Sequence, residues 1–460
     1  MAKYDVIIVG SGPAGIFAAL ELVNKKDGIK IAIIEKGRDI EQRNCPANTG
    51  RTSCVNCPTC SIVSGWGGAG AFSDGKLTLT TDFGGWLDEY MPKSEVQSLI
   101  NYVDEIYLKF GATDIIHGTD EEGIKKIQRR AATADLRLIP AKIKHLGTDK
   151  CFDILKNMRQ YLGNKVNIFV DTPVSQLIVK DGKISGVVTG DGKEIYADYV
   201  ICGPGREGSE WFAKESARLG LDMTTNPVDL GLRIEVPAVV MEHITDVVYE
   251  SKFIFYSKQF DDRVRTFCMN PHGKVVIENN SGLLTVNGHS FSNMKTENTN
   301  FAVLVSKSFT KPFKEPISYG KYIAALANML GGNVLVQRLG DLLSGRRSTD
   351  ERIKRGLVEP TLQDATPGDL SLVLPYRYMI SILEMLEALD KVAPGIYSRH
   401  TLLYGVEAKF YSSRLKLTPN LETQIRNLFA VGDGAGVTRG LAQASVSGVI
   451  AANEIIKRMK

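Results

Sequence analysis

The chain has 460 residues, of which 43% are hydrophobic, 23% are charged and 8% are aromatic. These ordinary proportions exclude a disordered, collagen-like or coiled-coil protein, and no apolar run reaches the roughly 18–20 residues that cross a bilayer. The formal net charge of +4 is too small to favour nucleic acid as a partner. A beginning that reads as a strand, without the features of a signal peptide, predicts a cytoplasmic protein.

The first residues predict a strand followed by a glycine turn and a helix. Lys3–Val9 is rich in β-branched residues, and the run after it is Gly10-Ser11-Gly12-Pro13-Ala14-Gly15. In this pattern Gly10 makes the sharp turn, Gly12 lets the backbone approach a pyrophosphate, and Gly15 permits close helix–strand packing. The helix N-terminus offers N–H groups to the anion. We assign these residues to cofactor binding: Gly10, Gly12, Pro13, Ala14 and Gly15.

A second apolar run at residues 29–34 completes a strand–helix–strand unit and ends in Glu35. An acidic residue at this position, about twenty residues after the last glycine, accepts hydrogen bonds from ribose hydroxyls in dinucleotide-binding folds. We assign Glu35 and its neighbour Lys36 to the same cofactor site. The opening of the chain therefore predicts a dinucleotide-binding domain.

Four of the seven cysteines follow in the pattern C-x8-C-x2-C-x2-C, formed by Cys45, Cys54, Cys57 and Cys60. Three interpretations stay open. The C-x2-C-x2-C run can cap three corners of a [4Fe–4S] cluster with Cys45 as a remote fourth ligand, four thiolates can hold tetrahedral zinc, or the thiols can be redox-active. In a protein that lacks a leader, the clustering indicates metal or redox chemistry in a reducing compartment.

Residues 65–77 read GWGGAGAFSDGKL, with five glycines in eleven residues. Such a loop predicts backbone pressed against a ligand. From it we assign Gly68, Ala69, Gly70 and Ser73 to cofactor binding.

The next region predicts helices at residues 92–111, near Glu121–Ala132 and at Cys151–Leu162. The second helix carries four cations, and we interpret them as a solvated helix face in preference to an RNA-binding patch. The strand Val166–Val170 then leads into a meander of strands that ends at Gly203-Pro204-Gly205. Residues 203–208 also fit G-x-G-x-x-G, but they follow a meander, so we favour no second dinucleotide-binding domain.

Between about 225 and 405 the sequence predicts strands and helices in a mixture typical of an α+β domain. The expected strands are Leu230–Val236, Arg263–Met269, Lys274–Glu278 and Phe301–Ser306. The expected helices are Ser318–Leu330, with Ser318 as its N-cap, and Tyr378–Val392.

Near the end of the chain, a short apolar strand runs into Gly432-Asp433, and residues 440–448 open the last helix. This segment resembles the carboxy-terminal FAD signature of the glutathione-reductase-like, two-dinucleotide-binding flavoprotein superfamily. The resemblance implies that Gly432 and Asp433 lie at the ribityl chain and that Gly440, Leu441 and Ala442 lie by the pyrimidine edge of the flavin. A positive helix end there would stabilise an anionic reduced flavin. It also implies that Val174 contacts the adenine and that Gly203 and Gly205 pass beneath the cofactor.

The clustered cysteines, the glycine loop and the sequence Gly-Val-Thr-Arg-Gly-Leu near the end together resemble a bacterial and archaeal family of FAD-dependent dehydrogenases whose substrates are uncharacterised. This resemblance covers most of the chain and implies tight, non-covalent FAD. It implies a Rossmann-like α/β domain with three layers, formed by residues 1–90, 150–225 and 405–460. Residues 91–149 form a helical insertion, and an α+β substrate domain at residues 226–404 covers the flavin.

The expected function is an FAD-dependent oxidoreductase that transfers hydride between flavin N5 and a small-molecule substrate. Electrons would come from NAD(P)H, from an electron-carrier protein, or through an iron–sulfur cluster on the four cysteines. Zinc is the less favoured metal for these cysteines. The protein itself needs a proton donor and a substrate anchor, for which the first candidates are Asp74, Lys76 and Arg439. Further candidates are Arg233, Glu235, His272, Lys409, Tyr411 and Arg414.

Two other functions remain open. A thiol–disulfide oxidoreductase would use Cys54, Cys57 and Cys60, because the reactive pair of the superfamily's disulfide reductases lies in this region of the sequence. A tRNA-modifying flavoprotein would need a concentrated basic surface, which the small net charge does not favour.

Overall fold

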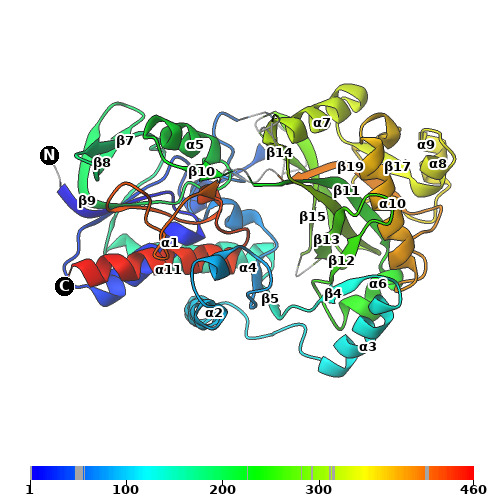
Figure 1. The fold of residues 1–460 in the computed structure, drawn as a ribbon, viewed down its shortest axis with the longest axis horizontal. Coiled ribbons are helices and arrows are strands. Elements are labelled where there is room, and N and C mark those ends of the chain that lie inside the picture. Colours follow the sequence, from blue (N-terminus) through cyan, green and yellow to red (C-terminus); the bar gives the residue numbers. More distant parts are fainter. Residues whose placement is uncertain are drawn as a thin grey trace. The chain divides into compact units, whose positions relative to one another are not determined.

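The computed structural model describes residues 3–46, 55, 57–224, 226–280, 282–291, 294–309, 312, 316–409 and 414–459. The chain forms two compact units (Figure 1). The first unit comprises Met1–Ile115, Lys144–Asn226 and Tyr411–Lys460, and the second comprises Ile116–Ile143 and Pro227–Phe410. The chain therefore leaves the first unit twice and returns to it twice.

The first unit is built on a seven-stranded sheet of mixed orientation, in the order β6-β2-β1-β9-β8-β7, with β21 beside β9. Its strands are β1 (Lys3–Val9), β2 (Ile31–Ile34), β6 (Asn167–Phe169), β7 (Val174–Lys180), β8 (Lys183–Thr189), β9 (Glu194–Cys202) and β21 (Leu428–Ala430). The pairs β1–β2, β1–β9, β2–β6 and β9–β21 are parallel, whereas β7, β8 and β9 are antiparallel neighbours.

The central strand β1 is apolar on both faces because both faces are covered. Val6 and Ile8 contribute to one buried cluster, and Ile7 and Val9 contribute to another on the opposite face. Such near-continuous apolar sequence is typical of parallel strands buried on both sides. The first cluster includes residues of the helices α1 (Pro13–Lys25), α2 (Lys93–Lys109), α4 (Thr148–Gly163) and α11 (Leu441–Arg458). The second includes a residue of α5 (Ser209–Arg218).

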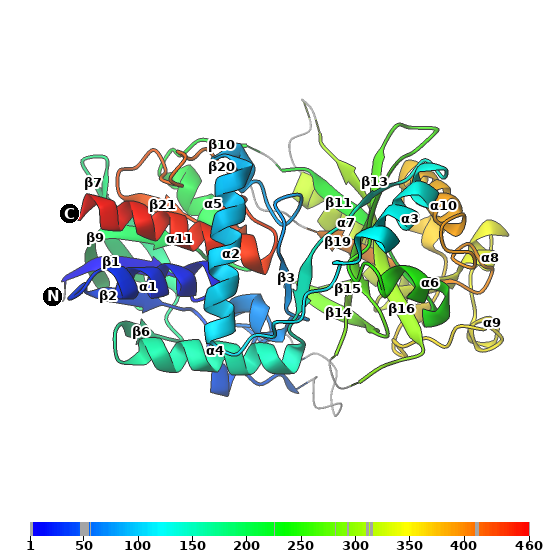
Figure 2. The same cartoon turned by 90° about the horizontal axis from the view of Figure 1, so that it is seen from below.

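The helices α1 and α11 lie side by side although more than 400 residues separate them (Figures 1 and 2). Their contact depends on a glycine. A Cβ atom built on Gly448 would lie 2.0 Å from the carbonyl oxygen of Ala14, so only glycine lets the two backbones approach this closely.

Shorter elements complete the first unit. They are η1 (Ile40–Gln42), η3 (Gly68–Phe72), β3 (Lys76–Thr78), η4 (Leu87–Glu89), β10 (Met223–Thr224), β20 (Arg414–Leu415) and η6 (Asp433–Ala435). The strand β5 (Ile143–His145) stands where the chain passes between the units and pairs with β3.

The second unit is built on an eight-stranded sheet in the order β18-β17-β19-β11-β16-β13-β12-β4. Its strands are β4 (Arg137–Ile139), β11 (Val228–Pro237), β12 (Lys252–Tyr256), β13 (Arg263–Asn270), β16 (Asn298–Lys307), β17 (Leu335–Arg338), β18 (Thr366–Pro367) and β19 (Leu402–Lys409). A separate hairpin pairs β14 (Lys274–Asn280) with β15 (Leu283–His289). The helical segments are α3 (Glu121–Ala132), α6 (Ala238–Thr245), α7 (Pro316–Gly331), α8 (Leu339–Leu343), α9 (Asp350–Lys354), η5 (Leu370–Leu372) and α10 (Tyr376–Asp390).

The central strand β11 shows how this sheet divides its two faces. Alternate residues Leu230, Leu232 and Ile234 belong to the apolar cluster that includes residues of α6 and α10. The residues between them include Arg233 and Glu235, which are nevertheless fully buried. Since successive side chains of a strand point to opposite faces, β11 has one apolar face and one face that is polar and buried.

The mixed α/β class predicted from the sequence is confirmed, with sheets of mixed orientation in both units. The helix α7 begins at Pro316, so the prediction that Ser318 caps it is wrong. Proline suits the first helical position, and this explains the earlier start. After residue 208 the next described strand is β10, and it pairs antiparallel with β20, which is not the parallel pairing that opens a dinucleotide-binding unit.

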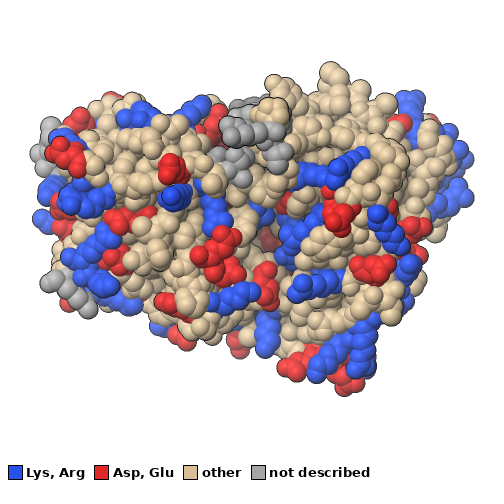
Figure 3. Space-filling model, in the orientation of Figure 1, with Lys and Arg blue, Asp and Glu red and all other residues tan. Residues whose placement is uncertain are grey.

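Surface charge is mixed in sign. On the face drawn in Figure 3, Lys and Arg side chains alternate with Asp and Glu side chains. Within the described ranges, no helix combines the length and the hydropathy that crossing a bilayer would need.

Candidate functional site

The N-terminus of α1 is shaped to receive a ligand. Gly10 has a φ of +94° and its N–H donates to the carbonyl of Ile34 at 2.8 Å, which forms the sharp turn after β1. Gly12 is the N-cap of α1, with Pro13 next, and no side chain caps the helix. A Cβ atom at Gly12 would meet no atom within 4 Å. The first turn of α1 therefore presents its N–H groups without a side chain in front of them.

The glycine loop lies against this turn. The N–H of Gly67 donates to the carbonyl of Ser11 at 2.8 Å, and a Cβ atom at Gly68 would lie 3.2 Å from the Cα of Gly12. A Cβ atom at Gly70 would meet the side chains of Leu441 at 2.9 Å and Pro13 at 3.6 Å. The loop thus passes between the N-terminal ends of α1 and α11. Ala69 lies within η3, and the hydroxyl of Ser73 donates to Gly70 just after it.

Glu35 follows β2, as expected, but the chain itself already supplies donors to its carboxylate. Oε2 accepts from the N–H and hydroxyl of Ser11, both at 2.9 Å, and Oε1 accepts from the N–H of Gly37 at 2.9 Å and of Gly65 at 3.0 Å. Because a carboxylate offers about four lone-pair positions, Glu35 can accept all of these bonds and so connects the two glycine loops, while its contact with a ribose stays a prediction. Lys36 pairs with Glu207 at 3.1 Å.

The segment before α11 supplies a carboxylate and a second uncapped helix. Oδ1 of Asp433 accepts from the hydroxyl of Thr438 at 2.7 Å, and Oδ2 lies 3.8 Å from Nε of Arg206. Burial raises the pKa of the Asp433 carboxyl, and Arg206, Thr438 and Arg439 oppose this effect. Gly440 is the N-cap of α11, and no side chain caps that helix either, so Leu441 and Ala442 open it with exposed N–H groups.

The return segment after β9 completes the surroundings. The N–H of Gly203 donates to Val9 at 2.8 Å, and a Cβ atom at Gly434 would lie 2.7 Å from the carbonyl of Gly205. Gly205 has a φ of +66°, and no atom lies within 4 Å of the Cβ position it lacks. Val174 is the first residue of β7 and pairs with Thr189 at the far end of the same sheet.

Four of the predicted segments thus converge: residues 10–15, 68–70, 203–205 and 432–442. A Cβ atom at Gly432 would lie 3.2 Å from Cβ of Ala14, and one at Gly203 would lie 3.7 Å from the same atom. Two uncapped helix ends and glycines that face open space fit a long, pyrophosphate-bearing cofactor such as FAD. From these segments, α1 and Gly12 would hold the pyrophosphate and Asp433 the ribityl chain.

The predicted catalytic residues lie beside this group of segments. Nζ of Lys76 pairs with Oδ2 of Asp74 at 3.1 Å, and both side chains are mostly buried. They follow η3 directly along the chain. The guanidinium carbon of Arg439 lies 3.8 Å from the centre of the Trp86 ring. Arg439 immediately precedes the N-cap of α11.

Three of the four clustered cysteines are described: Cys45 and Cys60 are half-buried, and Cys57 is exposed. Cys54 lies outside the described residues. Over the described ranges, no three His, Cys, Asp or Glu side chains are placed to hold a metal ion. Because the set includes Cys54, the iron–sulfur, zinc and thiol interpretations all stay predictions.

Sequence reasoning missed Arg43, which organises the loop between the cysteines and the glycines. Its guanidinium donates to the carbonyls of Ser61, Ile62, Trp66 and Gly68, at 2.9, 2.9, 2.6 and 2.8 Å. Burial lowers the pKa of Arg43 to about 10, against the opposing effect of Glu35. An isolated arginine in an irregular loop carries no sequence signal that predicts these contacts.

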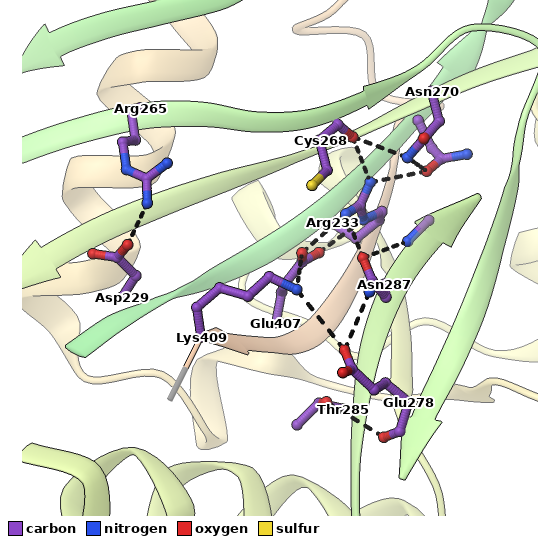
Figure 4. A network of polar contacts seen from close by, with 12 residues as sticks. Asp229, Arg233, Arg265, Cys268, Asn270, Glu278, Thr285, Asn287, Glu407 and Lys409 are labelled. Carbon is purple, nitrogen blue, oxygen red and sulfur yellow. Dashed lines mark hydrogen bonds and ion pairs between the residues drawn. The ribbon is translucent and has the colours of Figure 1, made fainter. Parts of the chain in front are cut away.

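The candidates in the second unit form a polar network on the buried face of its sheet (Figure 4). Arg233 donates to both carboxylate oxygens of Glu407, at 2.7 and 2.9 Å, and to the carbonyl of Cys268 at 2.9 Å. Lys409 pairs with the same Glu407 at 3.1 Å. Burial alone would raise the pKa of Glu407, but Arg233 and Lys409 outweigh it and lower that pKa.

Two further candidates of the second unit have partners of their own. Glu235 accepts from the hydroxyls of Tyr404 and Thr361, both at 2.5 Å, and burial raises its pKa against these bonds. His272 donates to or accepts from the carbonyl of Thr296 at 2.9 Å. Tyr411 lies outside the described residues, and Arg414 belongs to the first unit.

Comparisons with known proteins agree with this geometry. Residues 3–210 match the family described as "FAD binding domain", and residues 227–410 match "FAD-dependent protein, C-terminal domain-like". A protein of Clostridium beijerinckii, described only as an uncharacterised protein, is 28% identical over 99% of this chain and 81% of its own length.

Several solved structures are similar to this chain at low sequence identity. Glycine oxidase from Bacillus cereus is 13% identical, covering 100% of this chain and 96% of its own, with a TM-score of 0.42. L-proline dehydrogenase from P. horikoshii is 11% identical, covering 99% and 94%, with a TM-score of 0.42. Formate oxidase from Aspergillus oryzae is 13% identical, covering 100% and 98%, with a TM-score of 0.46.

The first match includes the N-terminal end of α1, the glycine loop and residues 203–205, whereas the segment at residues 432–442 lies beyond both matches. The chain is therefore similar, in order along its length, to an FAD-binding domain and to the C-terminal domain of FAD-dependent proteins.

Proposed function

We propose that this protein is an FAD-dependent oxidoreductase that transfers hydride between FAD and a small organic substrate. FAD, when bound, supplies the hydride chemistry at N5, and the chain supplies binding, orientation and proton handling. The single observation that carries the proposal is the pair of uncapped helix ends, α1 behind Gly12 and α11 behind Gly440, with the glycine loop between them. An oxyanion is stabilised at such helix ends.

The residues divide the task as follows. The first turn of α1 binds the pyrophosphate, and Asp433 orients the ribityl chain. Lys76, whose ammonium pairs with Asp74 at 3.1 Å, is the proposed proton donor to the substrate. Arg439 carries a positive charge next to the start of α11. Reducing equivalents come from NAD(P)H or from an electron-carrier protein.

The test begins with the colour of the purified protein. We expect yellow protein with flavin absorption bands, release of FAD on acid denaturation, and bleaching by NADH, NADPH or dithionite under anaerobic conditions. Protein that is colourless and takes up no added FAD would contradict the proposal.

The same sample separates the roles proposed for the cysteines. Iron and acid-labile sulfide would support a cluster, zinc alone would support a structural metal, and neither would leave redox thiols. Alkylation of Cys54, Cys57 and Cys60 before and after reduction, read by mass spectrometry, then tests the thiol–disulfide alternative.

A variant of Asp433 tests the site itself. Since burial raises the pKa of this carboxyl, its ionised form is disfavoured in the protein without FAD. Asp433→Asn should therefore leave the thermal midpoint of the apoprotein unchanged or slightly raised, while the affinity for FAD falls about tenfold through a lost charged hydrogen bond. Equal loss of apoprotein stability and FAD affinity would show that Asp433 is structural.

A further inference from the structure

The buried side chain of Arg43 holds the backbone of the glycine loop. Its Nη1 donates to the carbonyls of Trp66 and Gly68, at 2.6 and 2.8 Å. These two oxygens flank Gly67, whose own N–H donates to Ser11 in the turn before α1. Because each of these oxygens is directed at the guanidinium, Arg43 fixes the orientation of two peptide groups in the proposed FAD site.

The glycine loop needs such a constraint because its backbone is unusually free to rotate. Gly67 has a φ of +88° and Gly68 has a φ of +57°, a region that glycine enters without steric cost. The N–H groups of these two residues donate to Ser11 and Gly65, both at 2.8 Å. The carbonyls on either side of Gly67 are instead held by Arg43, so without the guanidinium these peptide groups could turn over.

The same guanidinium also holds the segment that follows Cys60. Its Nε donates to the carbonyl of Ser61 and its Nη2 donates to that of Ile62, both at 2.9 Å. The carbonyl of Cys60 accepts from the N–H of Ser64 at 2.9 Å, so residues 60–64 form a turn. One side chain therefore connects this turn with the glycine loop.

The surroundings of Arg43 are fitted to a guanidinium. A Cβ atom at Gly65 would lie 2.7 Å from Cδ of Arg43, and the guanidinium carbon lies 4.9 Å from the centre of the Phe72 ring. The planar fork of arginine reaches carbonyls on both sides at once. A lysine ammonium offers its donors from a single atom and cannot reproduce this fork.

We propose that Arg43 is a positioning residue of the FAD site. It keeps the carbonyls of Trp66 and Gly68 directed away from the pyrophosphate that the turn at Gly12 binds, and it transmits the order of the glycine loop to the segment after Cys60. A carbonyl oxygen turned toward the phosphates would repel them, whereas N–H groups attract them. The proposal rests on the proposed function, because it concerns the same FAD site.

The first test is the affinity of the apoprotein for FAD and for ADP, measured by isothermal titration calorimetry. Both ligands contain the pyrophosphate, so Arg43→Ala should weaken both by about 30-fold, and Arg43→Lys should weaken both by about tenfold. Guanidinium chloride, far below denaturing concentrations, should restore much of the affinity of Arg43→Ala, because the free ion fits the space that the variant leaves. The same concentration of sodium chloride should restore none of it.

Arg218→Ala is the matched control. Arg218 also donates to a backbone carbonyl, that of Leu177 at 2.9 Å, and pairs with Glu215 at 2.7 Å, but these contacts lie in α5 and β7. This variant should lower the thermal midpoint and leave the affinities for FAD and ADP unchanged, with or without guanidinium.

Hydrogen–deuterium exchange, read by mass spectrometry, tests the connection to Cys60. In the wild type, FAD should slow amide exchange in residues 60–64 as well as in residues 65–72. In Arg43→Ala, the slowing should be confined to residues 65–72. The amide of Ser64, which donates to Cys60, is among those measured.

Three results would overturn the inference. They are unchanged FAD affinity in Arg43→Ala, a loss of FAD affinity with ADP affinity retained, and full protection of residues 60–64 by FAD in Arg43→Ala. Wild-type protein that binds no FAD would contradict the proposed function instead. If Arg43→Ala does not fold, Arg43→Lys carries the same comparisons of affinity and exchange.

Discussion

The two units treat buried polar groups in opposite ways. Around α1 and α11 the polar groups are mostly backbone N–H groups at uncapped helix ends, and glycines keep the space before them open. On the polar face of the second unit, side chains satisfy one another: Arg233 pairs with Glu407, and Arg265 pairs with Asp229. In the first unit, helix N–H groups have no side-chain cap and are suited to bind a ligand. In the second unit, the hydrogen bonds between side chains specify the packing of the sheet.

Buried charged residues can therefore serve the fold of a unit without serving its chemistry. Arg233 is buried and charged, which first suggests catalysis. Yet its contacts reach four strands through Glu407, Cys268, Asn300 and Asn287, at distances of 2.7 to 3.3 Å. Arg233 is therefore better explained as a structural residue whose contacts hold the strands of the sheet and the hairpin together.

The largest expected effect is the loss of stability when Arg233 is replaced. Arg233→Met leaves Glu407 buried without its main partner, and we expect a loss of about 3–5 kcal/mol in the free energy of unfolding, measured with urea. The double variant Arg233→Met, Glu407→Met should recover only part of that loss, because it removes the carboxylate that lost Arg233 but leaves buried Lys409 with only Glu278, at 4.0 Å. A double variant no more stable than the single one would contradict the assignment.

Two glycines of the first unit differ in what an added Cβ atom would meet. Gly448→Ala should destabilise the protein by about 1–3 kcal/mol, since its Cβ would lie 2.0 Å from a backbone oxygen of α1. Gly12→Ala should leave the apoprotein as stable as the wild type, since its Cβ meets no atom within 4 Å. It should nevertheless weaken FAD binding by about tenfold or more, because a methyl group occupies the pyrophosphate position.

Thermal unfolding of the apoproteins and titration with FAD check both variants. Gly12→Ala with unchanged FAD affinity would remove the main support for the proposed pyrophosphate site. A destabilised Gly12→Ala apoprotein would instead mean that this glycine serves the fold.

The smallest effect concerns acid stability in the second unit. Burial alone would raise the pKa of Asp341, but hydrogen bonds from Arg338, Ser348 and Arg346 outweigh it and lower the pKa to about 2. The pKa of Asp341 in the folded protein is thus below its ordinary value of about 3.9. The ionised carboxylate therefore stabilises the fold fully above pH ~3.9, and this stabilisation is lost as the pH falls toward about 2. The difference in unfolding free energy between wild type and Asp341→Asn should shrink over this range in urea titrations. Parallel curves would contradict the assignment.

Much of the FAD-binding domain could be predicted because its signals are local. The turn at Gly10 to Gly15 and the strand before Asp433 are each readable from about ten consecutive residues. The contacts that could not be predicted join distant residues: Trp86 with Arg439, Arg43 with the carbonyls of residues 61–68, and Arg233 with Glu407. No periodicity encodes such pairs, because they depend on which strands and loops the fold brings together. The carboxylate of Glu35 was placed at the right strand end, but its bonds to Ser11 and Gly65 needed coordinates.

The backbone contact between Ala14 and Gly448 has a consequence for biosynthesis. More than 400 residues are synthesised between α1 and the helix that packs against it. A chain truncated before residue 441 would leave an apolar side of α1 uncovered. We expect such a truncated protein to be insoluble and colourless.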